Sequence, residues 1–209
     1  MDTLSEECTS VIFTAPDGKG QELKHALEAD GRVLQVLSYA TVPVSSEDGS
    51  LKCFVCEDFS RVTNDICYEG SNPARADEIA VGSALATVYA IGDEIEIKNG
   101  NGAYRYTVSG YVQSVNNSGM VCELTRAGFE NIGGHMPDVL NVYLDGAAAD
   151  TFIGEWERDA ADWILSSINY EQLVKSGQKL YAGVVSAVTA GVFVLSVLVV
   201  LLVMYIIIT

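Results

Sequence analysis

The sequence predicts an α+β domain that is followed by a single transmembrane helix. Strand-like and helix-like segments alternate near both ends of residues 1–169, and a turn-rich middle separates them. A strongly apolar segment without charged residues then runs from Leu180 to Ile208. A membrane core about 30 Å thick needs only about 20 helical residues, so this segment is long enough to span it with some tilt.

Residues 1–48 are expected to form the first half of the α+β domain. The stretch TSVIFTA is short and β-branched, as strands are. The stretch GKGQELKHALEADG places Leu23, Ala26 and Leu27 on one helical face and stops at Gly31. Because RVLQVLSYATVPV is again strand-like, the order is that of one β-α-β unit.

Residues 136–169 repeat this order and are expected to form the second half. DVLNVYLDG is typical of a strand, an amphipathic helix follows, and DWILSSIN is again strand-like. Two such halves favour a split ferredoxin-like α+β layer over residues 9–45 and 138–168. VIFTA and VLNVYL should then lie in one sheet.

Residues 49–135 have a different pattern and are expected to form an inserted β-rich lobe. Turn signals such as SEDGS, YEGSNP and VNNSG separate short strands. DEIEIKNGNGAYRYTVSGYV alternates on both sides of an Asn-Gly-Asn-Gly turn, which predicts a hairpin. One short helix is predicted from Ser83 to Ala90.

After this domain, residues 170–179 are expected to form a stalk helix and residues 180–208 the transmembrane helix. Gly183, Ala187 and Gly191 recur every four residues and therefore share one helix face. Small residues at this spacing let a second transmembrane helix approach closely. The alternative is that Gly and Ala are simply common in membrane spans.

The charge of the chain narrows its classes of function. The formal net charge is −16, and the part before the span carries it. Such a surface repels nucleic acid and anionic lipid headgroups, which argues against a nucleic-acid-binding or peripheral membrane protein. It could favour a cationic ligand, although a solvated acidic surface is the commoner explanation.

The N-terminal stretch MDTLSEECTSVIFTAPDGKG has neither the basic region nor the apolar core of a signal peptide. Two arrangements remain: a tail-anchored protein with a cytosolic domain, or a chain that lacks an earlier span. Lys175 and Lys179 precede the span and favour a cytoplasmic domain, but this signal is weak.

The cysteines are expected to be structural. The sequence KCFVC has the C-x-x-C spacing of a zinc half-site or a redox motif. Because the segment is strand-like, Cys53 and Cys56 should point to opposite faces, which is wrong for a shared metal. His25 and His135 are isolated, and the cysteine count of 5 is odd. We therefore expect neither a bound metal nor an obligatory disulfide.

Motifs of catalysis are also missing from the sequence. DGKGQE lacks the Gly-rich loop and the Ser/Thr of a phosphate-binding loop. No Gly-x-Ser-x-Gly, His-Glu-x-x-His or Cys/His/Asn set is present. The acidic stretch GEWERDAAD has the spacing of a solvated helix face rather than of a catalytic pair. We therefore expect no enzymatic activity and no cofactor.

The stretch YEGSNPARADEIAVGSALATVYAIGDEIEIKNGNGAYRYTVSGYV resembles the extracytoplasmic domain of the MacB/FtsX-like ABC transporter permeases. In that family a Gly-x-x-Pro turn leads to a Glu-Ile-Ala-Val strand, and a short helix, a Gly-Asp turn and a hairpin follow. The matching positions here are Gly70, Pro73, Glu78, Gly92, Asp93 and Gly110. The order of elements extends the resemblance over nearly the whole chain.

The resemblance implies an extracytoplasmic domain between the first and second spans of a four-span permease, with a second permease subunit and a separate ABC ATPase as partners. Since the other spans are not in this sequence, we expect a split gene product or a fragment. The outer domain would transmit ATP-driven motion to a substrate or an envelope partner. The alternatives are a single-span anchored binding or sensory module and, third, a membrane-tethered enzyme. The transported substrate does not follow from the sequence, because this fold serves several kinds of transport and regulation.

Overall fold

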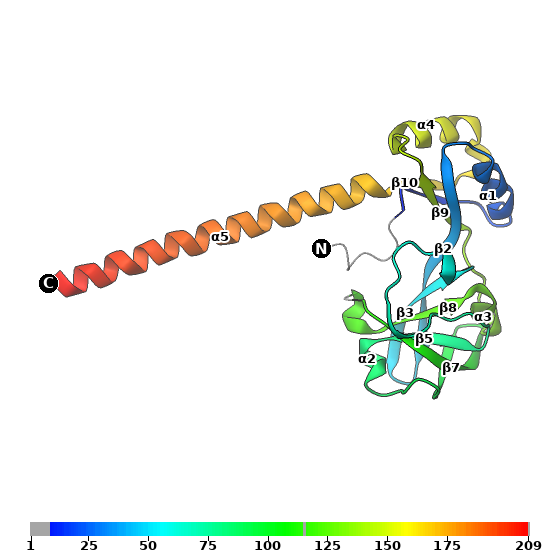
Figure 1. The fold of residues 1–209 in the computed structure, drawn as a ribbon, viewed down its shortest axis with the longest axis horizontal. Coiled ribbons are helices and arrows are strands. Elements are labelled where there is room, and N and C mark those ends of the chain that lie inside the picture. The colour runs from blue at the N-terminus through cyan, green and yellow to red at the C-terminus, as the bar shows by residue number, and fades with distance from the viewer. Residues whose placement is uncertain (1–8, 115, 209) are drawn as a thin grey trace. The chain divides into compact units, whose positions relative to one another are not determined.

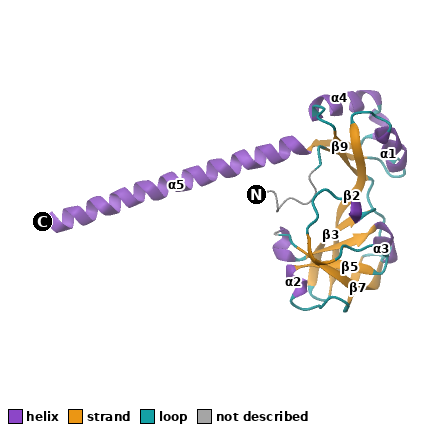
Figure 2. Ribbon diagram, in the orientation of Figure 1, coloured by secondary structure: helices purple, strands orange, loops and turns teal. Residues whose placement is uncertain are grey.

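The computed structural model of the chain describes residues 9–114 and 116–208 (Figure 1). The chain divides into two compact units, residues 1–169 and residues 170–209. The first unit mixes strands and short helices, whereas the second is one long helix (Figure 2). The predicted α+β class with a C-terminal apolar helix is therefore confirmed.

The first unit is built mainly from strands. Its strands are β1 (Val11–Thr14), β2 (Val33–Ser46), β3 (Gly49–Cys56), β4 (Cys67–Gly70), β5 (Glu78–Gly82), β6 (Glu94–Asn99), β7 (Gly102–Val112), β8 (Val121–Thr125), β9 (Val139–Leu144) and β10 (Ser166–Asn169). Its α-helices are α1 (Gly20–Glu28), α2 (Ser83–Ala86), α3 (Arg126–Asn131) and α4 (Ala149–Asp159), with 3-10 turns η1 (Phe59–Arg61), η2 (Asn116–Gly119) and η3 (Ala161–Trp163).

The strands form one continuous sheet with the order β10-β1-β9-β2-β3-β8-β5-β7-β4, and β6 pairs with β2 and β7. The long strand β2 joins the two parts of this sheet. Val33 to Ser38 pair with β9, and Tyr39 to Ser46 pair with β3. The proposed boundaries at residues 48, 49, 135 and 136 remain a prediction.

The first part of the sheet is a four-stranded antiparallel layer, β10-β1-β9-β2. VIFT and VLNVYL lie side by side as predicted, with Phe13 opposite Leu140. Both helices α1 and α4 pack on one face, because Leu27 and Phe152 belong to the same buried cluster as Phe13. The ferredoxin-like description of this layer stays an interpretation.

The start of helix α1 explains the sequence DGKGQE. The Asp138 carboxylate accepts hydrogen bonds from the backbone N–H groups of Gly18 and Gly20, at 3.1 and 3.2 Å. A Cβ on Gly20 would lie 2.3 Å from Asp138 Oδ1, so only glycine fits there. The first turn of the helix therefore already has an internal anion at its N-terminal N–H groups.

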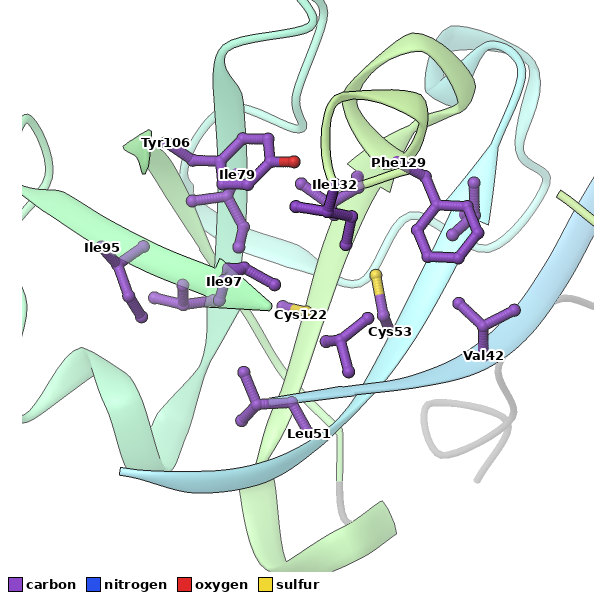
Figure 3. Close-up of a cluster of buried hydrophobic side chains, with 14 of the residues drawn as sticks. Val42, Leu51, Cys53, Ile79, Ile95, Ile97, Tyr106, Cys122, Phe129 and Ile132 are labelled. Carbon is purple, nitrogen blue, oxygen red and sulfur yellow. The ribbon is translucent and has the colours of Figure 1, made fainter. Parts of the chain in front are cut away.

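The second part of the sheet surrounds the largest buried cluster of the unit (Figure 3). Ile79 of β5, Ile97 of β6, Tyr106 of β7 and Cys122 of β8 meet in it, and Phe129 of α3 closes one side. The Tyr106 hydroxyl donates to the Gly128 carbonyl at 2.7 Å, so this large buried side chain leaves no unpaired donor.

Local patterns predicted this region well, with one correction. The hairpin of β6 and β7 is confirmed, with Asn99 opposite Gly102 around the predicted turn. The helix predicted from Ser83 to Ala90 is wrong in length, because α2 ends at Ala86. The Leu85 carbonyl accepts from the N–H groups of both Val88 and Tyr89, which closes the helix in a turn.

The stretch DWILSSIN is also shorter as a strand than predicted. Ala161 to Trp163 form the turn η3, and only Ser166–Asn169 pair with β1. Because β1 is itself four residues long, it offers partners to only four residues of β10.

The second unit is helix α5 (Tyr170–Ile208), which runs without a break across the predicted boundary between stalk and span at residue 180. Within it, Tyr170–Val199 is long and apolar enough to cross a membrane, and none of that stretch is buried. The apolar side chains that the structure describes on α5 after Lys179 are therefore exposed.

Candidate functional site

The glycines of the family-like stretch meet where β4 runs beside β7. Gly70 pairs with Gly110, and Gly70 has a φ of 77°, a conformation that L side chains rarely adopt. A Cβ on Gly110 would lie 2.6 Å from the Ser71 carbonyl oxygen and 2.8 Å from that of Glu69. The two chains approach so closely here that no side chain fits between them.

Glu78 holds the turn that leads into β5. Its Oε2 accepts from the N–H groups of Ala74 and Arg75, both at 2.9 Å, and its Oε1 lies 3.3 Å from Arg75 Nη2. Pro73 is buried in the same turn. The carboxylate therefore has a structural role that accounts for the Pro-to-Glu spacing.

Gly92 and Asp93 turn the chain into β6. Gly92 has a φ of 98° and its N–H donates to the Val108 carbonyl at 2.8 Å. The Asp93 carboxylate accepts from the Ala90 N–H at 2.8 Å. The six motif positions thus lie on three connected turns and strands, and all but the buried Pro73 have a conformational or hydrogen-bonding reason for their residue type.

The small residues predicted as a helix-packing face lie on α5. Gly183, Ala187 and Gly191 are all exposed, and a Cβ on either glycine would meet no atom within 4 Å. The described part of the chain thus provides no partner for this face, and its role stays a prediction.

The cysteines of KCFVC lie on strand β3 and point into different clusters. Cys53 belongs to the cluster around Tyr106, whereas Cys56 belongs to a separate one with Phe54. Cys53 stands opposite Cys122 on β8, and burial raises the pKa of the Cys53 thiol well above its usual value. Cys8 lies outside the described residues, within which no group of three metal-ligating side chains occurs.

The acidic stretch GEWERDAAD borders an open groove of about 620 Å³ between α1, α4 and η3. Arg32 bridges Asp30 and Glu155 there, with nitrogen–oxygen distances of 2.7 and 2.6 Å. Hydrogen bonding by Arg32 lowers the pKa of Asp30 to about 2, although partial burial opposes the shift. Because Asp30 and Glu155 pair with Arg32 and Asp159 pairs with Arg158, this groove offers structural ion pairs rather than an acid and a base.

A second groove, of about 490 Å³, lies between η1 and the turn around Pro73. An inner cavity of about 10 Å³ adjoins it and shares Phe59, Val62, Asp65 and Asn72 as walls. Glu123 lines the inner cavity, and only 3% of its surface is exposed. We call the two together the η1 groove.

The three-dimensional fold has known counterparts, although no protein-family model and no curated protein matches the sequence. The periplasmic region of MacB from Actinobacillus actinomycetemcomitans superposes with a TM-score of 0.51 at 9% identity, covering 80% of this chain and 91% of that one. The extracellular domain of the noncanonic ABC-type transporter YknZ from Gram-positive bacteria gives 0.49 at 12% identity, covering 70% and 88%.

The fold is that of the MacB periplasmic region. The resemblance inferred from the stretch around Gly70 and Gly110 therefore has a counterpart in three dimensions. The close backbone approach and the positive φ explain these glycines, and the fold assigns no chemistry to them.

Sequence analysis missed the η1 groove within this MacB-type fold. Glu123 is far in sequence from Asp65 and Asn72, and no motif links it to them. The one available signal was a glutamate inside the otherwise apolar strand VCELT, which alternation places on the side facing solvent.

Proposed function

We propose that this chain is a permease subunit of an ABC transporter, or part of one, with its folded unit outside the cytoplasm. The carrying observation is the combination of a MacB-type fold with a helix long and apolar enough to cross a membrane. The neighbouring structures are titled as periplasmic and extracellular regions of transporters, which supports the same side of the membrane for this unit.

The connection between the two units supports a role in transmitting movement. Asn169 is the last residue of β10, and Tyr170 is the first of α5, so no linker residue separates strand from helix. β10 is hydrogen-bonded to β1 along its four residues. In this proposal, movement of α5 driven by a separate ATPase passes directly to the sheet and from there to a substrate or an envelope partner.

The partner inside the membrane is a second transmembrane helix packed on Gly183, Ala187 and Gly191. An exposed groove of small residues gives up dispersion contacts to lipid that a closely packed helix would supply. The other spans of the transporter, including those of a second permease subunit, would provide that helix.

The location of the folded unit can be measured with a single introduced thiol. Gly31 is exposed and has open space around it, so Gly31→Cys in a background with Cys8→Ser and Cys67→Ser gives an accessible thiol. We expect a membrane-impermeant maleimide to label it in intact cells. The same background without Gly31→Cys measures labelling of the three buried thiols, Cys53, Cys56 and Cys122. Labelling only after the membrane is permeabilised would place the unit in the cytoplasm and overturn the proposal.

Association with an ATPase is the second part of the test. The full chain, purified in mild detergent from its native host, should carry ATP-hydrolysing activity together with additional transmembrane segments. Recovery of the chain alone, with the unit outside the cytoplasm, would instead support the anchored binding module.

A further inference from the structure

Three hydrogen-bond acceptors gather around the inner cavity of the η1 groove. Glu123 Oε2 and Asn72 Oδ1 are buried and have no hydrogen-bond partner. Asp65 contributes a carboxylate to the walls of both cavities. No Lys, Arg or His lines either cavity within the described part of the chain. The walls therefore supply acceptors and lack a matching cation.

Glu123 is buried because long-range packing covers its side of β8. It pairs with Phe54 of β3 and Ala80 of β5, so it lies in the middle of the sheet. Phe59 packs in the cluster on this side, and Glu123 and Phe59 line the same inner cavity. An isolated ionised carboxylate in such a place is unfavourable unless a partner offsets the loss of water.

The nearby Glu57 shows what such a partner normally does. Lys24 Nζ lies 2.6 Å from each oxygen of the Glu57 carboxylate, and both side chains are mostly buried. Glu123 is more deeply buried than Glu57 and has no such cation. The contrast shows that the described walls of the cavity supply Glu123 with no cation when it is ionised.

The orientation of Asn72 is fixed by its neighbour. Its Nδ2 donates to Asp65 Oδ1 at 3.0 Å, and Asp65 Oδ1 also accepts from the Cys67 N–H at 2.9 Å. Asn72 Oδ1 must therefore face away from that carboxylate. Once Glu123 is ionised, both orphan atoms are acceptors, so a donor with at least two N–H groups satisfies them together.

The two cavities set the shape of the missing donor. About 10 Å³ admits one group of the size of a water molecule, which matches an ammonium group and is too small for a planar guanidinium. The outer groove of about 490 Å³ has the apolar walls Phe59, Val62 and Pro73, beside which a methylene chain could lie.

We propose that the η1 groove binds a primary alkylammonium group, with the ammonium in the inner cavity between Glu123, Asn72 and Asp65 and the alkyl chain in the outer groove. The group belongs either to a free amine or to a lysine side chain of a peptide. The site does not depend on the proposed transporter function.

The protonation of Glu123 gives this proposal a distinctive signature. Burial, and to a lesser extent the charge of Asp65, raises the pKa of Glu123 to about 8. The other titratable groups around it are Cys67, Tyr39 and Cys53, and burial raises the pKa of the Cys67 and Cys53 thiols above the usual value. Glu123 is therefore mainly protonated near neutral pH, and an arriving ammonium should displace its proton. Affinity should rise with pH up to about 8 and then level off until the amine itself loses its charge.

The test is calorimetric titration of the full chain in detergent with n-pentylamine and, separately, with Nα-acetyl-lysine amide. We expect saturable millimolar binding and release of about one proton near pH 7, seen as a heat that depends on the buffer. Pentanol and pentyltrimethylammonium should bind at least about tenfold more weakly. Pentanol carries no positive charge, and pentyltrimethylammonium has no N–H group to donate. Tighter binding of the lysine derivative would identify a peptide as the source, and tighter binding of pentylamine a free amine.

Variants separate this site from general surface attraction. Glu123→Gln should weaken binding about tenfold and abolish proton release. Asp65→Asn should weaken binding less, because Asp65 is exposed to solvent. Glu130→Gln, on the exposed side of α3, is the matched control and should change nothing. Absence of saturable binding would mean that the cavity holds only water. Equal binding of pentanol, or unchanged binding by Glu123→Gln, would likewise overturn the proposal.

Discussion

Helix α5 and strand β8 depart from the usual distribution of residues in opposite ways. On α5, apolar side chains such as Leu180 and Val188 are exposed over 75% and 61% of their surface. On β8, Glu123 is buried, and its Oε2 has no hydrogen-bond partner. Soluble proteins normally bury the first kind of residue and expose the second.

The two departures differ in how they can be resolved. A lipid environment satisfies the described apolar side chains of α5 after Lys179 in the same way, because the helix already pairs its own backbone groups. A specific donor satisfies Glu123, because only a hydrogen-bonding group of the right size reaches it. The first departure therefore indicates an environment, and the second indicates a ligand.

Glu123 stays buried only if the sheet that contains β8 is tightly packed, and β4 and β7 belong to that sheet. Gly110→Val tests this packing and has the largest expected effect. A side chain at this position would collide with the backbone of Ser71 and Glu69, which cannot move aside cheaply. We expect a loss of about 3 to 5 kcal/mol in the free energy of unfolding. Urea unfolding of the full chain in detergent, followed by the near-UV circular dichroism of the folded unit, measures it.

Gly31→Ala is the control for this change, since a Cβ there meets no atom within 4 Å. It should alter the free energy of unfolding by less than about 0.5 kcal/mol. A Gly110→Val protein as stable as this control would show that β4 and β7 do not approach as closely as described.

The buried state of Glu123 predicts a dependence of stability on pH. Its pKa is raised from 4.5 to about 8, so the folded state holds a proton that the unfolded state releases. The stability contributed by this proton is complete below about pH 4.5 and is lost as the pH rises through about 8. The side chain of the Glu123→Gln protein cannot ionise. Between about pH 5 and 8, the free energy of unfolding of this variant should therefore fall by about 2 to 4 kcal/mol less than that of the parent.

Unfolding of both proteins in the absence of amines, at several pH values in that interval, measures the difference. Other groups titrate equally in the two proteins, so their contributions cancel. Parallel pH profiles would show that Glu123 is solvated, and the ligand argument for β8 would fail with it.

Sequence patterns predicted the parts of this fold that depend on near neighbours. The β6–β7 hairpin follows from alternation around its Asn-Gly turn, and α5 follows from composition alone. The end of α2 at Ala86 was missed, because the chain leaves the helix at Thr87 in a turn that no periodicity encodes.

The candidate ligand site could not be predicted in the same way. In VCELT, Cys122 and Leu124 face the main cluster, so alternation assigns Glu123 to a solvent-facing side. The segment from Phe59 to Asn72 covers that side instead, and it is brought there by contacts between residues far apart in the chain. A buried carboxylate of this kind is recognised only after the fold is known.

The smallest expected effect concerns α5 and the environment it requires. If lipid alone satisfies this helix, Gly191→Leu should be silent, since the larger side chain is as soluble in lipid as its neighbours. If a second helix packs on the small face, the same change fills the groove and should weaken association by about 1 to 2 kcal/mol. Energy transfer between labelled full-length chains and their co-purified membrane partners, titrated in detergent micelles, measures this.

Val199→Leu on the same helix is the control and should leave association unchanged, because it does not touch the face of Gly183 and Ala187. Because α5 and residues 1–169 form separate compact units, both variants should unfold with the parent's midpoint in urea. Unchanged association of the Gly191→Leu protein would remove the evidence for a helix partner and favour a single-span anchor, whereas the η1 groove would be unaffected by that outcome.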